Sequence, residues 1–343
     1  MAGFLQVPIV AVTRETAAHA DAPKGKATQE KALAAARQSG EPVEILSQRG
    51  ETRTVRALPN GRIEIEQHVQ PIRARHNGEW ADIDTTLRRS GEAIAPAATT
   101  VDLSFSGGGN GPMVQATRDG RKLALTWPQP LPEPTLDGDT AVYKGVAGPD
   151  VDLRLRALPD GFAHVLVVKT AQAAKDPRVA KLVLGLSTSG LLLREDPASG
   201  MLTAAASGSG AGVFAAPSPL MWDSSRPAGA SSKARAGESP ADPADEPAPG
   251  ARTARIEVAV GNGTLSLTPD PALLAAPDTR FPVFIDPVYR TLKASSWGMV
   301  SSGWPDENYP MFDGKSTEGV GRCEVARDPN CVKNQTKRLF YRT

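Results

Sequence analysis

The sequence predicts a mostly β protein whose main domain is antiparallel and sandwich-like. Short runs of alternating apolar and polar residues recur between about residues 43 and 222, as expected for strands with one buried face. Glycine and proline number 32 and 30 in 343 residues, which predicts frequent turns or a disordered segment. Asn77-Gly78 is the clearest hairpin signal, because both central residues of a type I′ turn need positive φ.

Residues 1–42 are predicted to be a leader region that ends in a short helix. Residues 3–12 resemble the apolar core of a signal peptide, and Ala18-His19-Ala20 has the small-x-small form of a cleavage site. The first basic residue, Arg14, follows this apolar run instead of preceding it. The segment is therefore read as a degraded or mis-started signal peptide, with an unstructured tail as the alternative.

The helix is predicted over residues 28–40. Thr28 can serve as its N-cap, the following residues are strong helix formers, and Gly40 supplies a C-terminal stop. Because its apolar residues are mainly alanines, we expect it to pack weakly and to act as a leader or spacer.

Residues 43–287 are predicted to form the β-rich domain. Strand patterns precede and follow tight turns, which predicts a series of hairpins. The turns are Leu58-Pro59-Asn60-Gly61, Asn77-Gly78, Arg118-Asp119-Gly120-Arg121, Leu158-Pro159-Asp160-Gly161 and Gly261-Asn262-Gly263.

Residues 223–250 consist almost entirely of Ser, Ala, Gly, Pro and charged residues. Such a segment buries too little apolar area to offset the entropy of ordering it, so a disordered excursion within the β domain is predicted.

Residues 288–343 gather aromatic residues with few alternating strands. We expect them to be the start of a second β domain that is truncated here.

The composition excludes some function classes. Basic and acidic residues number 39 and 38, so the chain lacks the electrostatic footprint of a nucleic-acid-binding protein. No apolar run approaches the roughly 18 to 20 residues of a transmembrane helix.

The two cysteines, Cys323 and Cys331, are predicted to form a disulfide that closes a short loop, with two free thiols as the alternative. We expect no metal site of zinc type, because four ligands are normally needed.

Candidate ligand-binding residues are two acidic pairs and one tryptophan. Asp82 and Asp84 are predicted to alternate on one strand beside Trp80, and Asp150 and Asp152 on another, so each pair would project from one sheet face. Paired carboxylates can act as acid and base or hold calcium, and a tryptophan can stack on a sugar. The competing interpretation is a solvated polar face and a tryptophan that anchors the core. No catalytic residues are predicted.

The order of these motifs resembles the N-terminal region of large secreted bacterial surface proteins of the LamG-like jelly-roll or RHS (YD-repeat) type. The matching stretches are residues 78–87, 104–109, 151–154, 166–169, 221–225, 281–287 and 337–342. The resemblance implies no catalytic residues in this region. It implies a secreted or cell-surface location, further domains downstream and contacts with cell-wall or extracellular carbohydrate or protein.

The expected function is therefore that of a non-enzymatic structural or adhesion scaffold without a required cofactor. A carbohydrate-binding module is the first alternative, and it predicts aromatic side chains exposed on a sheet face beside the acidic pairs. A hydrolase is the second, and it predicts a cleft where Asp, Glu or His converge.

Overall fold

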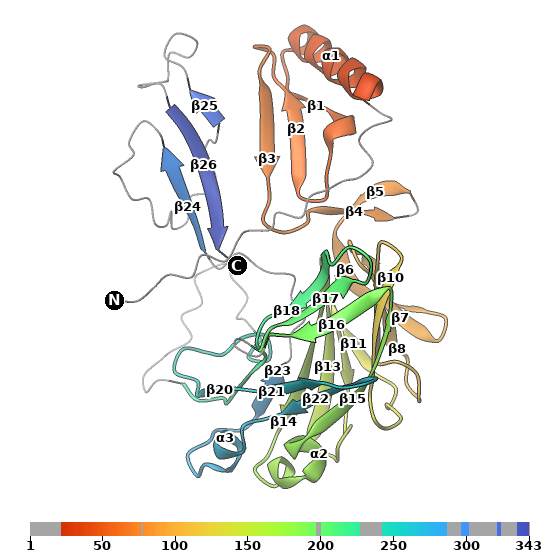
Figure 1. Cartoon of the computed structure of the whole chain (residues 1–343), viewed down its shortest axis with the longest axis vertical. Helices are drawn as coiled ribbons and strands as arrows, with labels where there is room; N and C mark the ends of the chain where they lie inside the picture. Colours follow the sequence, from red (N-terminus) through yellow and green to blue (C-terminus); the bar gives the residue numbers. More distant parts are fainter. Residues whose placement is uncertain are drawn as a thin grey trace. The chain divides into compact units, whose positions relative to one another are not determined.

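The structure is a computed structural model that describes residues 22–76, 78–196, 200–226 and 242–286, together with the backbone of three strands between residues 296 and 342. The chain divides into two compact units, Met1–Thr291 and Leu292–Thr343. The described part of the first unit is mostly antiparallel β, as the sequence predicts (Figure 1).

The larger sheet has the strand order β21-β22-β15-β10-β9-β8-β7-β6 among the described residues, and all its pairs are antiparallel. Hairpins join sequence neighbours from β6 to β10, and β15 then enters beside β10. The strands are β6 (Asp84–Ser90), β7 (Ala93–Ala98), β8 (Asp102–Ser106), β9 (Val114–Arg118), β10 (Arg121–Thr126), β15 (Leu182–Ser189), β21 (Glu257–Val260) and β22 (Thr264–Thr268).

The second sheet has the order β11-β12-β13-β14-β23-β19-β20 in the described part of the chain. Its longest strands, β13 and β14, pair over eight residues each and form its centre. The strands are β11 (Thr135–Asp137), β12 (Thr140–Tyr143), β13 (Val151–Leu158), β14 (Gly161–Val168), β19 (Leu220–Trp222), β20 (Thr253–Arg255) and β23 (Val283–Asp286).

One apolar core lies between these two sheets, so the unit is a β-sandwich. Leu103, Phe105 and Leu125 of the first sheet and Leu153 and Leu155 of the second belong to the same buried cluster. Inward residues alternate with outward ones along each strand, which is why the period-two pattern predicted the fold class.

A hydrogen bond inside the core also joins the two sheets. The Tyr143 hydroxyl on β12 donates to the backbone oxygen of Ser106 at the end of β8, at 2.5 Å. Burial raises the pKa of Tyr143 well above its usual value, so the hydroxyl keeps its proton and remains a donor.

A third sheet and short helices complete the first unit. The sheet has the order β16-β17-β18 and contributes Leu191, Leu202 and Phe214 to the core. Asp176 and Asp270 accept hydrogen bonds from backbone N–H groups at the starts of α2 and α3. The elements are β16 (Leu191–Glu195), β17 (Leu202–Ala206), β18 (Gly212–Ala216), η2 (Ala173–Lys175), α2 (Pro177–Ala180) and α3 (Pro271–Ala275).

The N-terminal part of the unit is a small sheet, β1-β2-β3, with helix α1 (Figure 1). Its Ala32 and Ala36 pack with Ile45, Val55 and Ala57 in a separate buried cluster. A two-stranded hairpin, β4-β5, follows in the chain. The elements are α1 (Ala22–Ser39), β1 (Val43–Glu44), η1 (Leu46–Gln48), β2 (Arg53–Ala57), β3 (Ile63–Gln67), β4 (Arg73–His76) and β5 (Glu79–Asp82).

One expectation about this helix is wrong. It begins at Ala22, so Thr28 lies inside it and is not its N-cap; its hydroxyl instead lies 2.7 Å from the Ser47 hydroxyl. Ala32 and Ala36 are buried against the small sheet, whereas weak packing and a leader or spacer role stay predictions. The predicted end is confirmed by Gly40, whose φ is +76° and whose N–H donates to the Ala36 oxygen.

The predicted hairpins are confirmed. β2 pairs with β3, β4 with β5, β9 with β10, β13 with β14 and β21 with β22. In the Arg118–Arg121 turn, both Asp119 and Gly120 have positive φ, as a type I′ turn requires. Gly78 has a φ of +85°, whereas Asn77 lies outside the described residues.

The prediction of disorder over residues 223–250 is wrong at both ends of that segment. Residues 223–226 and 242–250 are described, and Asp223 and Ala244 are buried. β19 and β20, on either side of the segment, pair directly, so the chain leaves and re-enters the same sheet. Residues 227–241 lie outside the described ones.

The second unit contains an antiparallel sheet of order β24-β26-β25 among its described strands, β24 (Ser296–Ser301), β25 (Gly321–Cys323) and β26 (Gln335–Arg342). Cys331 and the side chain of Cys323 are outside what the structure describes, so their disulfide stays a prediction. The predicted truncation is likewise untested.

Candidate functional site

The structure does not bring the predicted acidic residues together as one site. Asp82 ends β5 of the small hairpin, whereas Asp84 begins β6 of the large sheet, so the two are not on one strand as predicted. A change of sheet at Ile83 separates them. Asp84 lies 3.7 Å from Arg88 and accepts a hydrogen bond from the Thr86 N–H. The pKa of Asp84 is lowered, mainly by the hydrogen bonds from Thr86 and to a smaller extent by the charge of Arg88.

Trp80 is half-buried on β5, beside Arg75 of the neighbouring strand. The Arg75 guanidinium lies over its ring, 4.2 Å from the ring centroid, in a cation–π contact. Trp127 and Trp222 are buried and belong to the apolar clusters of the first unit. Within the described residues, then, no row of exposed tryptophans stands beside the acidic pairs.

Asp150 and Asp152 also have partners from the fold. Asp152 lies on β13, is 8% exposed, forms an ion pair with Lys169 at 2.7 Å and accepts a hydrogen bond from the Gly145 N–H. Asp150 precedes the strand and accepts a hydrogen bond from the Thr170 hydroxyl at 3.1 Å. These carboxylates stabilise the ends of the β13–β14 pair.

An open hollow of about 330 Å³ lies beside Asp150. Its charged lining residues are Asp150, Lys175, Asp176 and Arg178. Arg178 binds both carboxylate oxygens of Asp176, at 3.0 and 2.6 Å, and thereby lowers the pKa of that carboxyl. Its described lining residues include no histidine, serine, cysteine or aromatic residue, so they offer neither a histidine base nor a stacking platform.

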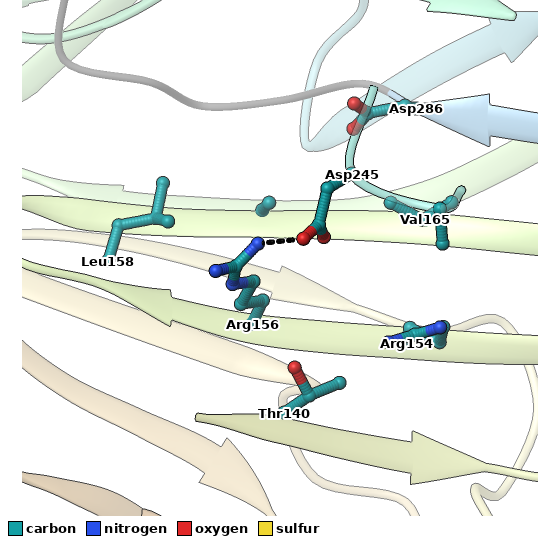
Figure 2. Close-up of a pocket in the computed structure, with 9 residues that line it drawn as sticks. Thr140, Arg154, Arg156, Leu158, Val165, Asp245 and Asp286 are labelled. Carbon is teal, nitrogen blue, oxygen red and sulfur yellow. Dashed lines mark hydrogen bonds and ion pairs between the residues drawn. The ribbon is translucent and has the colours of Figure 1, made fainter. Parts of the chain in front are cut away.

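One polar arrangement lies on the outer face of the second sheet, which is the face turned away from the sandwich core. There the chain returns as a strap, defined here as residues 242–252. Arg154 and Arg156 project from β13 toward it, since they alternate with the core residues Leu153 and Leu155. The strap closes over these side chains (Figure 2).

Two ion pairs hold the strap. Arg154 binds Asp242 at 2.5 Å, and Arg156 binds Asp245 as well as Asp139 from the β11–β12 turn. Burial alone would raise the pKa of Asp242, but the Ala244 N–H and Arg154 outweigh it and lower that pKa. Burial likewise opposes the charge of Arg156, whose acidic partners nevertheless raise its pKa.

An apolar contact accompanies these pairs. Ala244 is 1% exposed and belongs to a buried cluster with Val165, Trp222 and Phe284. The Trp222 ring stacks on Phe284, with ring centroids 5.7 Å apart, and its Nε1 donates to the Pro243 oxygen. The cavity that remains beneath the strap measures about 20 Å³, little more than the space of one water molecule.

Asp223 fixes the base of the strap, where the chain leaves the sheet and where it returns. Its Oδ1 accepts from the N–H groups of Ser225 and Arg252, and its Oδ2 accepts from the Ser225 hydroxyl and the Arg280 N–H. Burial alone would raise the pKa of Asp223, but these bonds outweigh it and lower the pKa. One carboxylate therefore joins three segments of the chain.

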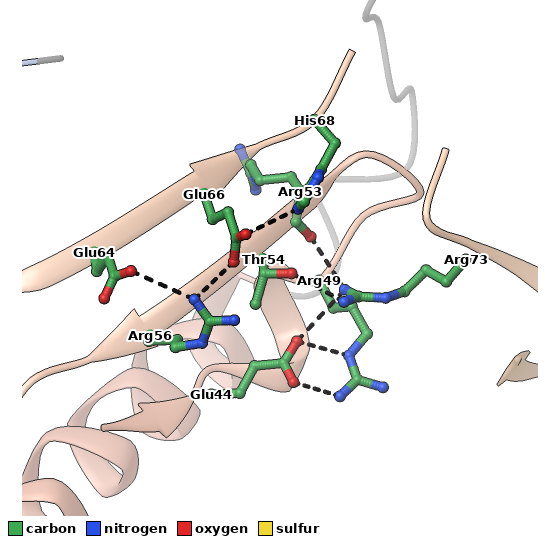
Figure 3. Close-up of polar contacts among 9 residues, drawn as sticks. All are labelled: Glu44, Arg49, Arg53, Thr54, Arg56, Glu64, Glu66, His68 and Arg73. Carbon is green, nitrogen blue, oxygen red and sulfur yellow. Dashed lines mark hydrogen bonds and ion pairs between the residues drawn. The ribbon is translucent and has the colours of Figure 1, made fainter. Parts of the chain in front are cut away.

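A second network of charges covers one face of the small sheet (Figure 3). Glu44 receives two hydrogen bonds from Arg49 and lies 3.5 Å from Arg73, which also donates to the Thr54 hydroxyl. Arg56 binds Glu64 and Glu66. Because Arg73 belongs to β4, the network attaches the β4-β5 hairpin to the sheet.

His164 is the other notable ionisable group. It is 1% exposed on the core side of β14, and its ring stacks on Phe162 with centroids 6.4 Å apart. Burial lowers its pKa to about 3, so the imidazole is neutral at physiological pH. It lies outside both hollows and faces the core.

The roles of Asp223 and of the ion pairs formed by Arg154 and Arg156 were not predicted from the sequence. A usable signal was present, since the two arginines alternate with buried leucines and must therefore project from the outer face of β13. The acidic partners were hidden because the composition around them is typical of disorder.

No protein family, curated protein or solved structure matches this chain. Among the described residues, no helix is long and apolar enough to cross a membrane, and no group of three or more His, Cys, Asp or Glu side chains is arranged to hold a metal ion.

Proposed function

We propose that this chain is a non-enzymatic scaffold of a secreted or cell-surface protein, which holds further domains of a LamG-like or RHS-like multidomain protein at the surface. The secreted location and the further domains rest on the sequence resemblance. The absence of catalysis rests on how the polar residues are used.

The observation that supports a scaffold is that the buried carboxylates of Asp152 and Asp223 serve the fold. Asp223 joins three backbone segments, Asp152 neutralises Lys169, and the strap is held by two arginines of β13. A catalytic carboxylate needs room for a substrate beside it, whereas these oxygens face protein donors.

The two alternatives receive less support from the described side chains. A hydrolase that uses carboxylates needs them free to reach a substrate or water, whereas in the hollow beside Asp150 both oxygens of Asp176 are bound by Arg178 and Asp150 accepts a hydrogen bond from the Thr170 hydroxyl. A carbohydrate-binding module needs an exposed aromatic platform, and Trp80 carries the Arg75 guanidinium on its ring.

A surface-display experiment tests the scaffold. The chain is fused between a bacterial export signal with a cell-surface anchor and a C-terminal epitope tag. We expect antibody to reach the tag on intact cells and external trypsin to leave a fragment containing β6 to β15. A matched fusion carrying Asp223→Ala should lose that fragment. Complete digestion of the parent domain at the surface would contradict the proposal.

A further inference from the structure

Among the described residues, strand β3 is an edge strand with features that favour pairing with another strand. It is the last strand in the order β1-β2-β3, and its five residues pair regularly with β2. Four other edges of the first unit carry protective features: β6 and β18 take part in irregular pairings, and β11 and β20 have three residues each. In the described part of the unit, β3 and β16 are the edges with five residues in regular pairing.

The unpaired backbone groups of β3 belong to its odd-numbered residues. The Leu58 N–H donates to the Arg62 oxygen, and the His68 N–H donates to the Thr52 oxygen, so even-numbered residues turn their backbone groups toward β2. In an antiparallel strand, the residues between these turn their backbone N–H and C=O groups away from the paired strand. Ile63, Ile65 and Gln67 therefore present N–H and C=O groups at the free edge.

The side chains of this edge form one apolar and one charged face. Ile63 and Ile65 are 36% and 58% exposed, and they lie directly opposite Ala57 and Val55, which are buried in the cluster that contains α1 residues. Glu64 and Glu66 lie on the other face, where Arg56 binds both (Figure 3). The buried apolar row thus continues to the edge and stops there uncovered.

We propose that the occupant of this edge is β3 of a second copy of the chain, paired antiparallel about a twofold axis at Glu64. In this register Ile63 lies opposite Ile65 of the second copy, and Arg62 lies opposite Glu66 of the second copy. Apolar residues then meet on one face and opposite charges on the other, each contact occurring twice. The result is a six-stranded sheet with a continuous apolar row beside both α1 helices.

The neighbouring registers complement each other less well. With the axis at Ile65, Glu64 lies opposite Glu66 of the second copy, which places like charges together twice. With the axis at Ile63, Glu64 lies opposite Arg62 of the second copy, but Ile65 lies opposite Gly61 and loses its apolar neighbour. In the proposed register Glu64 meets its own copy once, and Arg56 lies 3.4 Å from it in each chain to offset that repulsion.

Proline at Ile65 tests the pairing. The Ile65 N–H faces the free edge, so Ile65→Pro keeps the bonds to β2 but removes a donor and blocks an incoming strand. We expect the parent and the matched Ile65→Val variant to show a concentration-dependent dimer by sedimentation equilibrium. Ile65→Pro should weaken self-association by about tenfold or more, since two backbone hydrogen bonds are lost across the axis.

The register is tested by crosslinking, which also decides the matter if Ile65→Pro unfolds. Glu64→Cys should form a disulfide between two copies under mild oxidation, identified by mass mapping as a peptide pair with residue 64 in both halves, whereas Glu66→Cys should not. A parent that stays monomeric at its highest soluble concentration, or equal crosslinking at both positions, would overturn the proposal.

Discussion

The indole Nε1 of Trp222 donates a hydrogen bond to the backbone oxygen of Pro243 at 2.9 Å. Trp222 ends β19, and Pro243 lies in the segment that leaves the second sheet after β19 and returns before β20. This bond, the Ala244 contact and the two arginine ion pairs order residues whose composition is typical of disorder.

The strap should depend on the small apolar residue at position 244. Ala244→Asp places a charge beside Val165, Trp222 and Phe284, and we expect it to lower the free energy of unfolding by about 2 kcal/mol or more. Urea unfolding measures the effect. The matched change Ala171→Asp, at an exposed alanine, should have little effect; equal losses for both variants would mean that Ala244 is not buried.

Asp223 should make the fold sensitive to acid. Because its pKa is lower in the folded chain than its ordinary value of 3.8, its stabilisation is complete above that value and is lost as the pH falls through the folded pKa. Asp223→Asn should therefore cost about 1–3 kcal/mol at neutral pH and progressively less as the pH falls below 3.8. Asp278→Asn, which removes an exposed ion pair with Arg252, is the control and should cost under about 0.5 kcal/mol. An Asp223→Asn cost that does not change with pH would contradict this role.

His164 should make the stability of the fold depend on pH in a range above that of Asp223. Its pKa is about 3 in the folded chain and 6.5 ordinarily, so below pH 6.5 the unfolded chain binds a proton that the folded chain does not. The free energy of unfolding should then fall by about 2–3 kcal/mol between pH 7 and about pH 4.5 because of this group. His164→Phe should flatten that slope in urea titrations, whatever its effect at pH 7. An unchanged slope would show that the imidazole is not buried as described.

Gly107 should tolerate no side chain. A Cβ added there would lie 2.1 Å from the Glu92 backbone oxygen, whereas one at Gly111 would meet open space. Gly107→Ala should cost about 1–3 kcal/mol because the β7–β8 pair must shift, and Gly111→Ala should be near neutral. Thermal unfolding of the two variants checks this difference, and equal midpoints would contradict it.

The sequence predicted the hairpins well because turn chemistry and strand alternation are local. Asn-Gly or Asp-Gly turns fix which strands pair, and alternation identifies the buried face, as for Leu153 and Leu155. The N-terminal helix was placed less well: Thr28 is an acceptable N-cap residue, but the chain is already helical before it.

The site was predicted poorly because its contacts join residues far apart in the sequence. Asp242 and Asp245 meet arginines almost 90 positions away, and composition alone gave no sign of their order. The prediction that Asp82 and Asp84 lie on one strand failed for a different reason. The strand pattern continues through Ile83, but the chain changes sheets there. The alternation of apolar and polar residues therefore predicts which side chains share a sheet face within one strand, but it does not show where that strand ends.

We propose that the carboxylates and tryptophans in the described part of this chain stabilise a scaffold and act on no substrate. A panel of ester, peptide and glycoside substrates, combined with a glycan-binding array, tests this on the purified chain and on its Trp80→Ala and Asp150→Asn variants. We expect no turnover and no saturable binding by any of them. Turnover or saturable binding by the parent chain that is lost on Trp80→Ala or Asp150→Asn would overturn the proposal.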